Sequence, residues 1–517
     1  MLISNKWNPM AFAVDNKRIA RNTMMLYIRT ILVMLISLYM SRIILEVLGI
    51  NDYAIYQVVG GMVSMFSIIS SSLSVSISRH ITYEIGHGDK IKLRNIFSTA
   101  VTIQIFLAII VAIACEIISI WFIDSKMQVP PDKVIATKWV LQCTIVTFCF
   151  SLLSVPYNAC IVAHERMKAF AYVSLLDVSL KLGACFLLKL FSADHRLVGY
   201  AILLMVIAIC IRAVYSIYCY KNFEECRGKL HFNKPIFKEM ISFSAWSFFS
   251  NTTSIVNNQG VTMLINHFFG LTYNAARGLA SQVEGAVMQF VSNFTMAINP
   301  QITKSYAAGN LDEMYGLICR GAKFSYYAML FFSLPLILEM KPILALWLKD
   351  VPEHTAIFAQ LTLIMGMCDS IGSSGYTACM ATGKLRNYAL IVTPVGCLEF
   401  VFSWVLFVFG APAVSSYFLY ILVKVTILIV RMILMEKMIG LPIKKYMKQV
   451  FYPVICTSFF AIIIPISFKV LLPDTVLYGL CTVFVALISV VICVFFIGLT
   501  NTEKQIVSSY LNRIKHK

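Results

Sequence analysis

The chain has 517 residues, of which 59% are hydrophobic and only 13% charged, and its mean hydropathy is +0.79. A soluble domain has about 25% charged residues, so this composition excludes a soluble enzyme and a disordered protein and places the chain in a lipid bilayer. The net charge of +18 does not indicate a nucleic-acid partner, because most Lys and Arg residues fall in short loops between long apolar segments.

A helix needs about 20 mostly apolar residues to cross the hydrocarbon core of a bilayer. By this measure the sequence predicts fourteen membrane-spanning helices, of which the seventh and eighth are unusually polar. They cover residues 22–48, 53–78, 95–123, 134–163, 169–190, 197–220, 239–269, 273–299, 317–347, 355–382, 387–410, 413–435, 449–471 and 475–499.

Loop charge gives an independent test of this count. If the N-terminus is cytoplasmic, the cytoplasmic segments hold 28 of the 43 Lys and Arg residues, and the opposite side holds seven. Positive residues concentrate in cytoplasmic loops, and removing one helix would scramble the alternation. We therefore predict both termini in the cytoplasm and a multi-pass protein of a bacterial inner membrane.

An internal repeat relates the two halves of the chain. A shift of 221 residues aligns Gly49 with Gly270 and Gly88 with Gly309, and five further identities lie near them without a gap. Six predicted helices separate the copies, so both halves have the same orientation. The predicted fold is all-α, with two parallel six-helix lobes and two added C-terminal helices. Its parts are a cytoplasmic segment 1–21, a lobe 22–220, a linker 221–238, a lobe 239–436, helices within 437–499 and a cytoplasmic tail 500–517.

Two stretches of the repeat carry a family resemblance. They are "LGINDYAIYQVVGGMVSMFSIISSSLSVSISRHITYEIGHGD" at 48–89 and "FGLTYNAARGLASQVEGAVMQFVSNFTMAINPQITKSYAAGNLDEM" at 269–314. Each resembles the start of a lobe in the multidrug/oligosaccharidyl-lipid/polysaccharide (MOP) flippase superfamily, and the chain is most similar to the O-antigen and capsule repeat-unit flippases. The resemblance implies alternating access around a central cavity and a sugar chain on polyprenyl pyrophosphate as cargo.

The two polar helices, 239–269 and 273–299, cannot face lipid throughout. Hydrogen bonds between helices would explain their side chains, but the density of polar residues favours one wall of a hydrated cavity. Arg277 and Glu284 lie two helical turns apart on one face, about 10.5 Å from each other. Arg277 is the predicted contact for pyrophosphate or an acidic sugar, assisted by Arg29, with Glu284 tuning the cavity charge. The residues expected to bind the glycan are Ser250, Asn251, Asn258, Gln259 and Gln282.

Three charged residues, Asp369, Glu399 and Lys424, fall near the middles of consecutive predicted helices. Such a cluster is either structural or a site for a coupling cation, and Asp369 and Glu399 are the candidates for Na⁺ or H⁺ coupling. Asp177 and Lys181 are expected to neutralise each other, and Arg431 is expected near the membrane interface. No other cofactor and no metal site are expected.

Several functions remain open at this stage. The leading interpretation is a flippase of lipid-linked oligosaccharide for surface polysaccharide synthesis, whose partners would be membrane lipid and the polymerase and glycosyltransferase machinery. The alternatives are a cation-coupled multidrug or small-molecule exporter, a lipid II flippase, or a non-transporting scaffold. An enzyme is not expected, because the sequence has no catalytic motif and its longest outer loop is only about ten residues.

Overall fold

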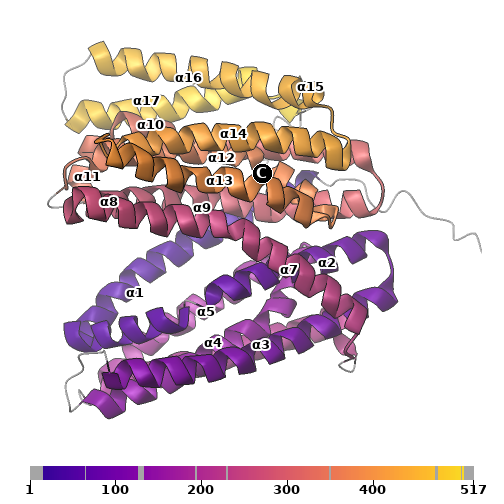
Figure 1. The fold of residues 1–517 in the computed structure, drawn as a ribbon, viewed down its shortest axis with the longest axis vertical. Coiled ribbons are helices and arrows are strands. Elements are labelled where there is room, and N and C mark those ends of the chain that lie inside the picture. Colours follow the sequence, from indigo (N-terminus) through magenta and orange to yellow (C-terminus); the bar gives the residue numbers. More distant parts are fainter. Residues whose placement is uncertain are drawn as a thin grey trace, which may run out of the picture. The chain divides into compact units, whose positions relative to one another are not determined.

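The computed structural model describes residues 16–64, 66–125, 133–192, 195–228, 231–347, 351–471, 476–501 and 503–505. Within these ranges the chain forms helices and no strand, so the predicted all-α class is confirmed (Figure 1). The chain divides into two compact units. Unit 1 contains the residues up to 248 together with 303–309, and unit 2 contains 249–302 together with the residues from 310 onward. Residues 239–248, which the sequence analysis assigned to the second lobe, therefore pack with unit 1.

Unit 1 is built from six long helices and the first part of a seventh. Two 3₁₀ turns, Leu188–Leu190 and Glu224–Arg227, follow the fifth and sixth helices. Buried apolar residues such as Val59, Val111 and Leu141 form its core. The helices are α1 (Asn16–Ser64), α2 (Ser67–His87), α3 (Lys90–Ser125), α4 (Val134–Ala163), α5 (Met167–Leu187), α6 (Arg196–Asn222) and α7 (Lys234–Ile255).

Unit 2 continues from the end of α7 through a π-helical turn, Val256–Gly260. Its core is formed by buried residues such as Ala280, Phe358 and Leu363. The remaining helices are α8 (Val261–Phe269), α9 (Leu271–Ala307), α10 (Leu311–Leu338), α11 (Met340–Trp347), α12 (Thr355–Ala381), α13 (Leu385–Val408), α14 (Ser415–Ile439), α15 (Ile443–Tyr446), α16 (Tyr452–Leu471) and α17 (Val476–Cys493).

The glycines that the repeat aligned adopt matching backbone conformations. Gly49 has φ 77° and its counterpart Gly270 has φ 85°, while Gly88 has φ 89° and its counterpart Gly309 has φ 78°. A residue with a Cβ rarely adopts such angles, so glycine allows the chain to turn sharply between consecutive helical segments at these points. The two halves thus share these turns as well as the seven aligned identities.

The predicted spans are helical over most of their described residues, and short turns interrupt or end several of them. In the described part, ten helices are long and apolar enough to cross a membrane. The four predicted spans outside this set are 22–48, 53–78, 239–269 and 273–299, which belong to the two copies of the repeat. The count of fourteen, with cytoplasmic termini, remains a prediction.

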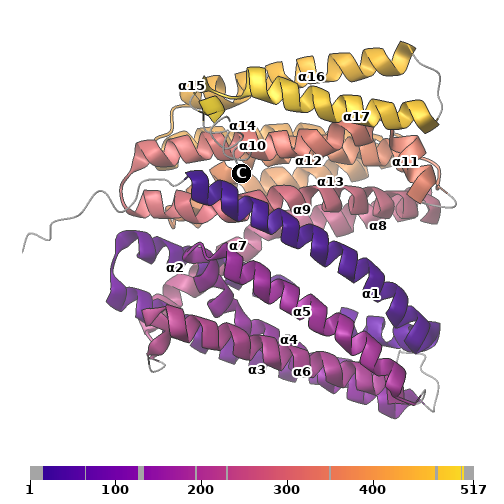
Figure 2. The same cartoon turned by 180° about the vertical axis from the view of Figure 1, so that it is seen from behind.

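The last two long helices are attached to unit 2 through α10. Helices α16 and α17 pack against each other, and α17 also lies along α10 (Figure 2). The ammonium of Lys323 on α10 donates to the carboxylate of Glu503 at 2.8 Å, and both side chains are buried. Just after the other end of α10, Glu339 pairs with Lys469 of α16 at 3.2 Å. These contacts fix the added helices to α10 at two places about 24 Å apart along the helix.

Candidate functional site

The π-helical turn between α7 and α8 contains two consecutive asparagines whose side chains lie in different surroundings. Asn257 is buried, and its side-chain amide donates to the carbonyl of Gly396 on α13 at 3.0 Å. Asn258 lines a pocket beside α9. The wider turn also changes the local backbone pairing, as is frequent at functional sites. The main-chain oxygen of Asn257, within this turn, accepts a hydrogen bond from the side chain of Arg277.

Arg277 is held from two directions. Its Nε donates to the hydroxyl of Thr262 at 3.1 Å, and its Nη2 donates to the carbonyl of Asn257 at 3.4 Å. The guanidinium also lies 5.7 Å from the centre of the Tyr417 ring. The side chain is 9% exposed, so this cation is buried within unit 2. A guanidinium has five N–H donors, and these contacts leave donors for a ligand.

Arg277 lines a pocket of 480 Å³ whose lining residues all belong to unit 2. Three of the predicted site residues, Asn258, Arg277 and Glu284, line this pocket together. The sequence analysis missed Thr262, which lies one turn after Asn258 on the same face and orients the arginine. The full lining is Asn258, Thr262, Arg277, Ser281, Glu284, Gly285 and Met288.

The other predicted binding residues whose side chains the structure describes do not line this pocket. Ser250 is half-buried on α7, and its hydroxyl has no hydrogen-bond partner among the described residues. Asn251 is also half-buried, and Gln282 is exposed on α9. The side chain of Gln259 lies outside the described residues. Arg29 belongs to unit 1, where its guanidinium lies 5.1 Å from the centre of the Phe170 ring.

Glu399 on α13 is the most deeply buried carboxylate of the predicted cluster. It is 1% exposed, and its Oε2 accepts no hydrogen bond from the part of the chain that the structure describes. Arg277 and Lys424 are the cations whose charge acts on it, and Asn257 is its polar neighbour. A buried acceptor without a donor is costly, so this oxygen is suited to take up a proton or a cation.

Asp369 differs from Glu399 because it already has a cationic partner. The ammonium of Lys424 on α14 lies 3.1 Å from the Asp369 carboxylate on α12, and it also lies 5.2 Å from the centre of the Tyr420 ring. A coupling cation at Asp369 would have to compete with this ammonium. Arg431, which was expected near the membrane interface, is buried among its neighbours, and its Nε donates to the hydroxyl of Tyr388 at 2.9 Å.

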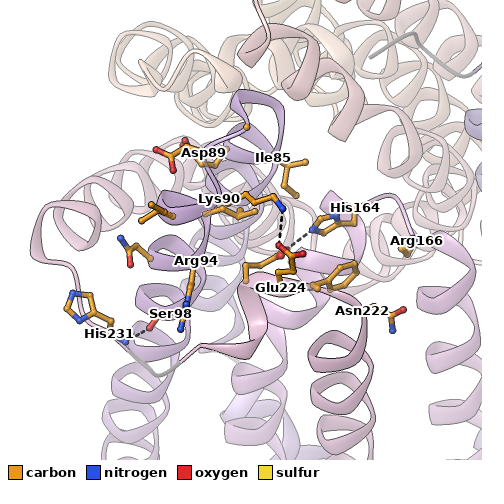
Figure 3. Close-up of a pocket in the computed structure, with 17 residues that line it drawn as sticks. Ile85, Asp89, Lys90, Arg94, Ser98, His164, Arg166, Asn222, Glu224 and His231 are labelled. Atoms are coloured by element: carbon orange, nitrogen blue, oxygen red, sulfur yellow. Dashed lines mark hydrogen bonds and ion pairs between the residues drawn. The ribbon is translucent and has the colours of Figure 1, made fainter. Parts of the chain in front are cut away.

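Unit 1 contains a second and larger pocket, of 800 Å³, between the ends of its helices (Figure 3). Lys90 pairs with Glu224 at 3.0 Å, and His164 pairs with Glu225 at 2.6 Å. Figure 3 shows these two contacts meeting in the middle of the pocket. The ammonium of Lys90 lowers the pKa of the exposed Glu224 carboxyl, so this carboxylate stays charged at neutral pH.

The wall of this pocket is formed by the segment that joins α6 to α7. The backbone N–H of His231 donates to the hydroxyl of Ser98, and that of Asn233 donates to the hydroxyl of Thr99 at 3.3 Å. Gly228 lies directly against the guanidinium of Arg94. The sequence analysis treated this segment as a linker, and its polar contacts show that the described part of it is docked on α3.

Comparisons with known proteins fit this architecture. Residues 26–187 match the MatE family model, whereas no curated protein matches the sequence. A MATE structure in complex with MaD3S has a TM-score of 0.68 at 14% identity, covering 83% of this chain and 97% of that chain. An outward-facing multidrug resistance MATE family transporter has a TM-score of 0.69 at 12% identity, covering 82% and 96%.

A third similar structure is a MOP superfamily transporter from Pyrococcus furiosus, described as having a binding pocket of reverse polarity that suggests a different function. Its TM-score is 0.68 at 13% identity, covering 82% of this chain and 96% of that chain.

Residues 26–187 therefore resemble a MatE domain, and the chain has the fold of the MATE transporter structures. MATE transporters belong to the MOP superfamily, so the superfamily resemblance seen in the sequence is supported. They are transporters and not enzymes, in agreement with the prediction. The comparisons do not support the polysaccharide-flippase branch that the sequence analysis favoured.

Proposed function

We propose that this chain is a cation-coupled exporter of the multidrug type that works by alternating access. Its cargo is an amphipathic small molecule with a negatively charged group, bound in the 480 Å³ pocket of unit 2. The MatE match and the likeness to MATE structures support the class. The pocket, with Arg277 in its lining, supports the proposed location of the binding site and the negative charge of the cargo.

The observation that carries this proposal is the position of Arg277. Its buried guanidinium lines the pocket, and two of its donors already bond to Thr262 and Asn257. The guanidinium is therefore oriented before the cargo binds. Hydrogen bonds between an arginine and an anionic group are stronger than neutral ones, and they can form in pairs. Glu284 lines the same pocket and would favour a cargo that also carries a hydroxyl or an amine.

Glu399 is the proposed coupling residue. It belongs to the same unit as the pocket, Arg277 acts on its charge, and its Oε2 has no donor among the described residues. A cation or proton on Glu399 would change the electrostatic environment of Arg277. Binding of the cation and binding of the anionic cargo would therefore be linked through one guanidinium.

The second candidate cargo is a lipid-linked oligosaccharide carried toward the outer leaflet of a bacterial inner membrane. The same pocket supports it, because Arg277 can hold a pyrophosphate while Asn258, Thr262 and Ser281 offer hydrogen bonds to sugar hydroxyls. Under this alternative the polysaccharide polymerase and glycosyltransferase machinery would be the functional partners.

Transport by the purified chain in proteoliposomes distinguishes these cargoes. Uptake would be measured with anionic, cationic and neutral amphiphiles of equal size, and with a polyprenyl-pyrophosphate oligosaccharide, under imposed Na⁺ and H⁺ gradients. We expect uptake of the anionic amphiphile, driven by one of the gradients. Arg277→Ala should reduce it about 10- to 100-fold, because a charged hydrogen bond contributes about 1.5 to 3 kcal/mol. Arg320→Ala, which removes a half-buried arginine of α10 outside the pocket, is the matched control.

Each alternative gives a different result. Transport of the lipid-linked oligosaccharide alone would establish the second candidate. Preference for the cationic amphiphile, or full activity of Arg277→Ala at matched protein levels, would overturn the assignment of Arg277. Absence of transport for every cargo would favour the scaffold interpretation.

A further inference from the structure

A groove between α13 and α14 has a composition unlike the two pockets described above. It encloses 430 Å³ within unit 2, where the first turn of α13 meets the last turn of α14. Two lysines and one asparagine form its polar part, and four apolar residues form the rest. The lining consists of Lys384, Asn387, Leu390, Ile391, Leu434, Lys437 and Met438.

Both lysines are available to a ligand. Lys384 and Lys437 are exposed, and their ammonium groups have no hydrogen bond or ion pair within the described ranges of the chain. No carboxylate is among the described residues that line the groove, whereas the pocket of unit 1 pairs Lys90 with Glu224. The start of α13 adds to the positive potential, since the first N–H groups of a helix carry partial positive charge.

The apolar part of the groove continues into the surface that faces lipid. Leu390 and Ile391 are 47% and 46% exposed, and they follow Lys384 by six and seven residues along α13. This spacing places them about 9 to 10.5 Å along the helix from the lysine. A phosphate at the lysines would therefore continue into acyl chains that cover these side chains. The distribution of loop charge predicts that this end of unit 2 faces the cytoplasm, where anionic lipid headgroups attract lysines.

We propose that this groove binds an anionic phospholipid of the cytoplasmic leaflet, with its phosphate between Lys384 and Lys437 and one acyl chain along Leu390 and Ile391. The apolar wall favours a lipid over a soluble phosphate, because a free anion would leave that wall uncovered. The site does not depend on which cargo the pocket of unit 2 carries.

Native mass spectrometry of the full chain, titrated with phosphatidylglycerol or phosphatidylcholine of equal acyl chains, tests this proposal. Each lysine near an anionic surface contributes about fivefold in affinity, so Lys384→Gln with Lys437→Gln should weaken binding of phosphatidylglycerol about 30-fold. Binding of phosphatidylcholine should not change. The control pair is Lys444→Gln with Lys448→Gln, which removes two exposed lysines nearby in the sequence but outside the groove and should leave phosphatidylglycerol binding unchanged.

Three results would overturn the proposal. They are equal binding by the groove variant and the unchanged chain, an equal loss in the control pair, and displacement of the bound lipid by glycerol phosphate without acyl chains. A second measurement locates the lipid. Leu390→Trp in vesicles should lose more fluorescence to brominated phosphatidylglycerol than to brominated phosphatidylcholine, and equal quenching by the two lipids would place the anionic lipid elsewhere.

Discussion

The charged side chains of the two units differ in their partners: carboxylates in the unit 1 pocket form ion pairs, whereas Arg277 and Glu399 in unit 2 form none with the described residues. In the unit 1 pocket, Glu224 and Glu225 each face a basic partner, Lys90 and His164, at the ends of helices. In unit 2, the hydrogen bonds of Arg277 to described residues go to neutral oxygens, and the Oε2 of Glu399 accepts no hydrogen bond from the described residues. Charges that are already paired stabilise one arrangement, whereas charges held by neutral groups remain available to a ligand. The comparison therefore directs the search for cargo chemistry to unit 2.

The largest expected effect is on coupling. Glu399→Gln should abolish accumulation of cargo against its gradient while exchange of cargo across the membrane continues, because the amide cannot bind the coupling proton or cation. Glu224→Gln in unit 1 should leave accumulation intact. Both are measured in proteoliposomes with and without an imposed cation gradient. If Glu399→Gln still concentrates its cargo, coupling takes place at another residue.

A second test asks whether the arginine geometry of unit 2 is special. Arg277→Lys keeps the charge, but an ammonium cannot bond to Thr262 and Asn257 and also offer two parallel donors to an anion. We therefore expect an approximately tenfold loss of transport. Arg94→Lys, in the exposed pocket of unit 1, should stay within about twofold because its charge remains. Initial rates at matched protein levels provide the comparison. Equal losses in both variants would remove the distinction between the two pockets.

The ion pair of Asp369 and Lys424 should matter for stability. Asp369→Asn would leave the mostly buried ammonium of Lys424 without its partner, which we expect to cost about 1 to 3 kcal/mol and to lower the apparent Tm. Adding Lys424→Met should recover much of this loss. Glu224→Gln, which removes an exposed pair, should leave Tm unchanged. A cation site at Asp369 would instead show itself as stabilisation by Na⁺ that disappears in Asp369→Asn.

The smallest expected effect concerns close packing around a buried cation. A Cβ at Gly372 would clash with the Nη1 of Arg431, so Gly372→Ala should displace this arginine from Tyr388 at a cost of about 1 kcal/mol. Gly183→Ala on α5 of unit 1 meets no atom within 4 Å and should be neutral or slightly stabilising. Thermal unfolding of the two variants in detergent measures the difference. An unchanged Tm for Gly372→Ala would mean that Arg431 relocates without cost.

Patterns of hydrophobicity and repetition predicted the fold well because they act over whole helices. The shift of 221 residues anticipated that Gly49 and Gly270 share one backbone conformation, and the spacing of Asp177 and Lys181 anticipated their ion pair at 2.8 Å. The same reasoning grouped Arg277 with Glu284, since both face one side of α9.

The finer arrangement of the site could not be predicted because it depends on a local irregularity. A regular helix through 239–269 gives no sign that Asn257 faces α13 while Asn258 faces the pocket, and the π-helical turn decides this. The sequence also could not predict whether Asp369 or Glu399 forms the ion pair with Lys424, because this depends on packing between α12 and α14. The docking of the linker on Ser98 and Thr99 could not be predicted either, because it uses backbone N–H groups that carry no sequence signal.

The ion pair between Lys323 and Glu503 sets a timing requirement for biogenesis. The two residues lie 180 positions apart, and a ribosome adds about 5 to 20 residues per second. Lys323 is therefore synthesised about 10 to 40 s before its partner exists, and during that time α10 must keep an ammonium hydrated or near lipid headgroups. Synthesis of Glu503 thus completes the burial of a charge that enters the membrane much earlier. Correct assembly of unit 2 must therefore tolerate a long-lived intermediate in which α10 is not yet fully buried.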